Sequence, residues 1–133
     1  MNAAVASPYP VSTMSRWRVR LITDVRDLER LQQDWQGFER APTDHEAVFF
    51  QSFDWCHYVA NLRSTRSPDR YRLLVAVVED GPDIVGIWPL SRQRSSRMWI
   101  IRNLDDPFGQ MAGFLCRDSD AIEPCVHAIL EHV

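Results

Sequence analysis

The sequence predicts a single α/β domain with a mostly antiparallel central sheet flanked by helices. Two β-rich runs, 71–80 and 84–94, are joined by a Gly-Pro turn, and apolar residues recur at helical spacing before and after them. The predicted element order is β-α-α-β-β-β-(β)-α, where the bracketed strand is the less regular segment 111–116. Because 133 residues suffice for one hydrophobic core, we expect one domain over 17–133, preceded by a flexible leader over 1–16.

The composition excludes several classes of protein. Hydrophobic residues make up 45% and the formal net charge is -3, which favours a globular chain and gives no electrostatic reason to expect nucleic acid as a partner. Three cysteines without a C-x-x-C pair argue against a disulfide framework or a zinc site, so we expect a reduced, cytoplasmic setting. No apolar run approaches the length of a membrane span.

The first strand and helix are predicted from periodicity. Residues 17–22 alternate apolar and charged side chains, as in a half-buried strand. Asp24 can cap a following helix, and Pro42 disfavours helical geometry in the residue before it, so one helix should end near Ala41. Its apolar stripe consists of Leu28, Leu31, Trp35 and Phe38.

The segment 49–63, FFQSFDWCHYVANLR, holds the residue types of a nucleophilic site. Ser52 or Cys56 could attack, with His57 as base and Asp54 orienting it. On a helix, however, residues five apart point about 140° away from each other, so Ser52 and His57 cannot form a local dyad. We therefore interpret the segment as a buried helix that Ser52 caps, with His57 on its polar flank and Asp54 as the only group near enough to pair with it.

The hairpin region gives the clearest strand signal. Residues 73–78 are continuously apolar, which predicts a strand covered on both faces. Pro89 cannot donate a ladder hydrogen bond, so a bulge or an unpaired edge is expected there. A third strand should cover 97–104. Alternation assigns one face of the second strand to Ile84, Gly86, Trp88 and Leu90.

The loop 105–110, DDPFGQ, carries the best concentration of polar groups beside a strand end. Asp105, Asp106 and Gln110 are the candidate substrate-binding residues, and a carboxylate there could accept a proton from an attacking group. The alternative is a solvated turn, which Asp, Pro and Gly favour for backbone reasons.

The last segment, 119–133, is predicted to be a helix with Ser119 or Asp120 as its cap. Cys125, His127 and His132 do not have the spacing of metal ligands on one helix face, so no metal site is expected. The predicted buried stripe is Ile122, Cys125, Val126, Ile129, Leu130 and Val133.

Four stretches together resemble a known family. They are W-x-x-F at 35–38, FFQSFDW at 49–55, LLVAVVEDGPDIVGIWPLSRQR at 73–94 and DPFGQMAGFL at 106–115. They are similar to the amino-terminal half of the bacterial GNAT-type acetyltransferases associated with cellulose and exopolysaccharide biosynthesis, and distantly to Fem-type transferases. The chain departs from the family pattern at Phe53, where the family has proline after serine.

The resemblance implies an acyl-CoA-dependent transfer to an amine or hydroxyl acceptor, such as a sugar or another small molecule. The family's cofactor loop is glycine-rich and binds pyrophosphate at a helix start. The matching segment here, 116–123, has no glycine and three acidic residues. Acetyl-CoA or another acyl-CoA is therefore expected in a second, carboxy-terminal GNAT-like half or a second copy, while this chain forms the acceptor side and is inactive alone. The alternative is a non-catalytic binding or scaffolding module with a degenerate GNAT fold.

Overall fold

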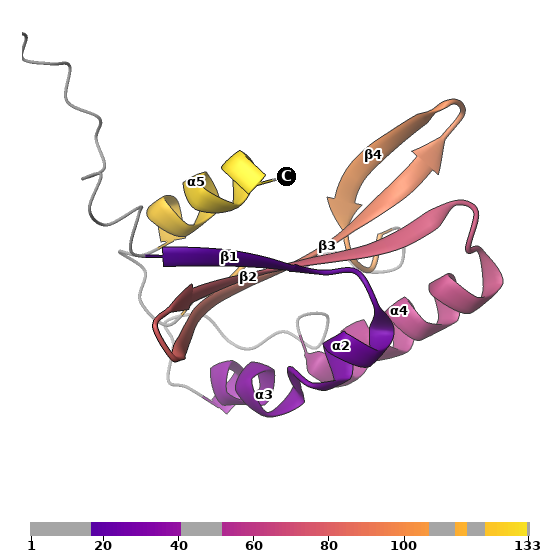
Figure 1. Ribbon diagram of the computed structural model, residues 1–133. Coiled ribbons are helices and arrows are strands. Elements are labelled where there is room, and N and C mark those ends of the chain that lie inside the picture. Colours follow the sequence, from indigo (N-terminus) through magenta and orange to yellow (C-terminus); the bar gives the residue numbers. More distant parts are fainter. Residues whose placement is uncertain (1–16, 41–51, 107–113, 117–121, 133) are drawn as a thin grey trace, which may run out of the picture.

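The computed structural model describes residues 17–40, 52–106, 114–116 and 122–132. Five strands form one antiparallel sheet, in the order β1-β2-β3-β4, with β5 also paired to β3. Helices α2, α3 and α4 lie on one face of the sheet and α5 lies on the other (Figure 1). The elements are β1 (Trp17–Ile22), α2 (Val25–Glu29), α3 (Gln32–Arg40), α4 (Phe53–Arg66), β2 (Tyr71–Asp80), β3 (Asp83–Ser95), β4 (Met98–Asn103), β5 (Leu115–Cys116) and α5 (Ile122–His132). The predicted α/β class and the antiparallel sheet are confirmed.

The hairpin of β2 and β3 forms as predicted. Its two-residue turn places Gly81 at a φ of 61°, and the favoured two-residue hairpin turns need a positive φ at their first central residue. Strand β2 is buried from Leu73 to Val78, with no side chain more than 2% exposed. Helices therefore cover both of its faces, as the continuous apolar run indicated.

A β-bulge changes the faces of β3. Asp80 pairs with Asp83 and Glu79 with Ile84, but Val78 pairs with Gly86, so one extra residue, Val85, enters β3. Ile84 therefore packs in the core under α2, α3 and α4, whereas Trp88 packs on the α5 side. The prediction that Ile84 shares a face with Gly86, Trp88 and Leu90 was wrong, because strict alternation ends at a bulge.

Pro89 lies where no described strand pairs with the outer side of β3. Strand β5 pairs with Gly86 and Ile87, and β4 pairs with β3 from Leu90 onward. The carbonyl of Pro89 accepts a hydrogen bond from Leu104 N at 3.0 Å, on this same outer side. The proline nitrogen thus faces the interval between the two partner strands, and the predicted unpaired edge is found there rather than a bulge.

The first helical segment is broken, contrary to the single helix predicted over 24–41. Asp24 caps α2 by accepting a hydrogen bond from Arg26 N at 2.7 Å, but α2 ends at Glu29 and α3 begins at Gln32. The expected apolar stripe, Leu28, Leu31, Trp35 and Phe38, is nevertheless buried throughout. The break occupies less than one helical turn, so the apolar side chains on either side of it still pack in the core.

Helix α5 packs through a narrower stripe than predicted. Cys125, Ala128 and Ile129 are buried, but Ile122 and Leu130 are 38% and 63% exposed. These two residues were wrongly assigned to the core because α5 contacts the sheet over β1 and β2 and leaves its other apolar flank open. The proposed cap residues and Val133 lie outside the described residues.

Candidate functional site

The candidate residues at the end of β4 sit on a firmly anchored segment. Leu104 is fully buried, and its carbonyl accepts a hydrogen bond from the Tyr71 hydroxyl at 3.0 Å. Its amide donates to Pro89 O, as described above. The backbone just before Asp105 and Asp106 is therefore fixed to both β2 and β3, which gives these two side chains defined positions.

Asp105 points into the protein. It is 1% exposed, and its Oδ2 accepts a hydrogen bond from Trp55 Nε1 of α4 at 2.9 Å. Its Oδ1 is buried and has no hydrogen-bond partner among the described residues. A buried, half-satisfied carboxyl group is unusual in a native fold. Direct contact between Asp105 and a substrate stays a prediction.

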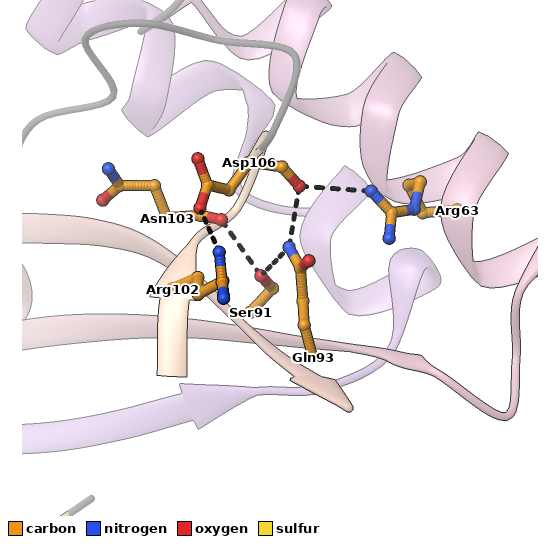
Figure 2. A network of polar contacts seen from close by, with 6 residues as sticks. All are labelled: Arg63, Ser91, Gln93, Arg102, Asn103 and Asp106. Carbon is orange, nitrogen blue, oxygen red and sulfur yellow. Dashed lines mark hydrogen bonds and ion pairs between the residues drawn. The ribbon is translucent and has the colours of Figure 1, made fainter. Parts of the chain in front are cut away.

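Asp106 joins a polar network that links α4, β3 and β4 (Figure 2). Its carbonyl oxygen accepts hydrogen bonds from Gln93 Nε2 at 2.8 Å and Arg63 Nη1 at 3.1 Å. Its carboxylate Oδ2 lies 3.3 Å from Arg102 Nη1. Ser91 completes the network by accepting from Gln93 and donating to the Asn103 carbonyl. The network fixes the backbone of Asp106 and leaves its side chain partly exposed.

A cleft of about 450 Å³ lies between the sheet and α5, and Asp106 is among the residues that line it. Trp88, Leu90, Ile101, Ile129 and Leu130 provide apolar lining, and Arg102, Asn103 and Asp106 provide polar groups. Mostly apolar walls with a few polar groups are typical of small-molecule sites. The cleft could hold a small molecule and place its polar group against Asp106.

No local pattern in the sequence predicted this cleft. Asp106 was predicted as a site residue, but Trp88 and Ile129 come from distant segments that only the fold brings together. Gln110, the third candidate, lies outside the described residues. Among 17–40, 52–106, 114–116 and 122–132, no three His, Cys, Asp or Glu residues gather closely enough to hold a metal ion.

The nucleophile types of α4 are structural, as the helical spacing indicated. Ser52 Oγ accepts a hydrogen bond from Trp55 N at 3.2 Å and so caps α4. His57 stacks on the Phe53 ring at a centroid distance of 5.4 Å, and its Nε2 lies 3.1 Å from Glu29 Oε1. The partner of His57 is thus Glu29 of α2 rather than the expected Asp54, because α2 packs beside α4.

Two buried thiols and one buried phenol are further groups that could react. Burial raises the pKa of Cys56 and of Tyr71 well above their ordinary values, and Asp105 adds to both shifts. A hydrogen bond with Cys116, together with burial, raises the pKa of Cys125. These three groups therefore stay protonated at neutral pH and are poor nucleophiles.

The Cys56 shift predicts a loss of stability at alkaline pH. An unfolded thiol loses its proton near its ordinary pKa of 9.0, whereas the buried Cys56 thiol keeps it. Above pH 9 the unfolded state therefore binds fewer protons, and the free energy of unfolding should fall with rising pH. In urea denaturation between pH 9 and 10.5, Cys56→Ala should reduce this slope by about 1.4 kcal/mol per pH unit. An unchanged slope in Cys56→Ala would contradict the assignment.

The geometry thus provides a cleft between the sheet and α5 that Asp106 borders. Within the part of the chain that the structure describes, no helix has both the length and the apolar character needed to cross a membrane. No known family matches the chain, and neither a curated protein nor a solved structure matches it.

Proposed function

We propose that the chain is the acceptor-side domain of an acyl-CoA-dependent acyltransferase of the GNAT type. The cleft between the sheet and α5 takes an amine or hydroxyl acceptor, such as an amino sugar. Acyl-CoA is bound by a second GNAT-like half or by a second copy of the chain. The three cysteines form no disulfide among the described residues, which agrees with a reducing, cytoplasmic setting for this chemistry.

The position of Asp106 carries the proposal. Asp106 lines the cleft, its carboxylate pairs with Arg102, and its backbone is fixed by Gln93 and Arg63. A carboxylate held in this way can hydrogen-bond an amine or hydroxyl and accept its proton when the group attacks a thioester. Trp88 and Leu90 offer an apolar surface for the body of the acceptor.

The first turn of α5 argues against cofactor binding by this chain. Glu123 lies in that turn, where its negative charge opposes a pyrophosphate at the helix start. A calorimetric titration of residues 1–133 with acetyl-CoA should therefore show no binding. Micromolar affinity for acetyl-CoA would defeat the proposal that the cofactor belongs to another half.

Acceptor binding is tested separately, with glucosamine as the probe. Chemical-shift perturbation should map glucosamine to the cleft, and Asp106→Asn should weaken its binding about tenfold because a charge-assisted hydrogen bond is lost. Asp83→Asn is the matched control, since it removes the same charge from the exposed start of β3. Equal glucosamine affinities in the two variants would show that Asp106 does not bind the acceptor.

A non-catalytic binding module is the second candidate. Glu123 in the first turn of α5 favours it for this chain taken alone, because a negative charge there disfavours a cofactor that carries a pyrophosphate. The two candidates differ in what the reading frame encodes after Val133. A GNAT-like segment with a glycine-rich loop there supports the acyltransferase, whereas an unrelated segment supports the binding module.

A further inference from the structure

Two arginines face each other on neighbouring strands without an acidic partner. Arg72 of β2 pairs in register with Arg92 of β3, and both side chains are exposed on the sheet face that also carries α5. Neither guanidinium forms an ion pair with any described residue. Like charges directly opposite in a sheet destabilise it. The repulsion between the two arginines therefore lowers the stability of the fold, and a bound anion would remove this repulsion.

Trp99 holds one of these arginines in place. The Arg72 guanidinium lies over the Trp99 ring of β4, 4.8 Å from its centroid, so the side chain reaches across β3. A guanidinium stacked on an aromatic face keeps its in-plane N–H donors available. Arg72 is thus ordered before an anion binds, so its side chain loses less conformational entropy on binding.

The same two arginines line two hollows of the surface. One hollow, of about 500 Å³, extends from Arg72 and Arg92 toward Tyr71, Leu74 and Ser64. The other, of about 250 Å³, is lined by Arg72, Arg92, Trp99 and Ile101. Both arginines therefore border concave surface with polar and apolar walls, where a small molecule can be held.

The two stretches of sequence that carry the pair are rich in positive charge. The stretches 63–72 and 90–99 together hold seven arginines and one acidic residue, Asp69, whereas the formal charge of the whole chain is -3. The resulting positive potential attracts anions to this end of the sheet. Two neighbouring arginines neutralise a dianion, whereas a monocarboxylate carries only one negative charge.

We propose that Arg72 and Arg92 form a binding site for the phosphate of a small phosphate monoester. The phosphate, a dianion near neutral pH, lies between the two guanidinium groups, and the organic part of the ester packs beside Trp99 and Ile101. The site is separate from Asp106, although Ile101 lines both the cleft that Asp106 borders and the hollow of about 250 Å³. It goes beyond the proposed function, because it does not depend on acyl transfer.

The test is a calorimetric titration of residues 1–133 with phenyl phosphate, inorganic phosphate and acetate. Phenyl phosphate should bind most tightly and acetate should not bind. Arg92→Gln should weaken phenyl phosphate at least about tenfold, as expected for loss of a charge-assisted hydrogen bond. Arg72→Lys keeps the charge but loses the paired N–H donors of the guanidinium and its stacking on Trp99, so it should also weaken binding.

Arg97→Gln is the matched control, because it removes one positive charge from the exposed turn between β3 and β4, away from both hollows. It should change phenyl phosphate affinity less than about twofold. Asp106→Asn should leave this affinity unchanged, so failure of the acceptor proposal can be told apart from failure of this one. Equal weakening by Arg92→Gln and Arg97→Gln, or no binding of phenyl phosphate at millimolar concentration, would overturn the site.

Thermal unfolding gives an independent readout. Without ligand, Arg92→Gln should melt at a higher temperature than Arg97→Gln, since only the former relieves the opposed charges. Phenyl phosphate should raise the melting temperature of the unmodified chain and of Arg97→Gln, but not that of Arg92→Gln. A single-stranded oligonucleotide that stabilises both variants equally, with no effect of phenyl phosphate, would assign the surface to polyanions and also overturn the proposal.

Discussion

Replacing Trp55 by phenylalanine should lower the free energy of unfolding by about 2–3 kcal/mol. The change removes the indole Nε1 that donates to Asp105 Oδ2, while Asp105 stays 1% exposed in the same place. Because Oδ1 already lacks a partner among the described residues, the carboxyl group would then be buried without any described donor. Urea denaturation followed by circular dichroism measures the loss.

Asp105→Asn is the informative companion to Trp55→Phe. An amide keeps an acceptor oxygen for Trp55 Nε1 but cannot be ionised, so the single variant should be about as stable as the natural chain or more stable. In the Trp55→Phe background it should restore more than about 1 kcal/mol. A loss in Asp105→Asn as large as that in Trp55→Phe would show that the carboxyl group itself stabilises the fold. Gain of stability would instead indicate that the carboxyl group is retained for function.

Trp35→Ala should cost about 3–5 kcal/mol, the largest effect expected from any single change discussed for this protein. Trp35 of α3 is fully buried and meets the Phe53 ring of α4 edge to face, at a centroid distance of 5.8 Å. Truncation leaves a cavity between α3 and α4, which few other contacts join. The melting temperature and the urea midpoint should both fall sharply.

Trp99→Ala provides the matched control, since it deletes the same side chain from an exposed position. Trp99 is 39% exposed on β4 and contacts Arg72 through its ring face. Its loss should cost less than about 1 kcal/mol, the usual value of an exposed cation–π contact. Comparable losses from the two tryptophan variants would contradict the view that the core lies between the sheet and α2, α3 and α4.

The strands were predictable because their signals are local. Alternation over 17–22, the Gly-Pro turn and the apolar run 73–78 each act within a few residues, and all three appear in the structure. The broken helix was not predictable in the same way. Leu28, Leu31, Trp35 and Phe38 form the same buried stripe whether or not the chain interrupts the helix at Arg30 and Leu31, so periodicity does not detect the break.

The register of β2 and β3 explains why the sequence alone did not predict the arginine pair. Extending the pairing of Asp80 with Asp83 without a bulge would set Arg72 opposite Ser91. The extra residue at Val85 shifts the register by one and brings Arg72 opposite Arg92. No feature of the local sequence announces this bulge, so the pair becomes visible only in the folded sheet.

The candidate site was predictable only in part. The polar loop after the third predicted strand identified Asp105 and Asp106, but their roles depend on partners far away in sequence. Trp55, fifty residues before Asp105, determines that this side chain turns inward. Arg63 and Gln93 likewise fix Asp106 from α4 and β3. Such tertiary contacts have no signature in spacing or composition.

We expect the outer part of strand β4 to open more readily than the other described strands of the sheet. It forms the outer edge of the sheet beyond β3, rises on the α5 side in Figure 1, and has five of its six residues exposed. Segments with few buried apolar contacts open at a small fraction of the global unfolding free energy. We therefore expect the amide protons of the outer part of β4, away from its anchored end at Asn103, to exchange faster than those of the buried strand β2.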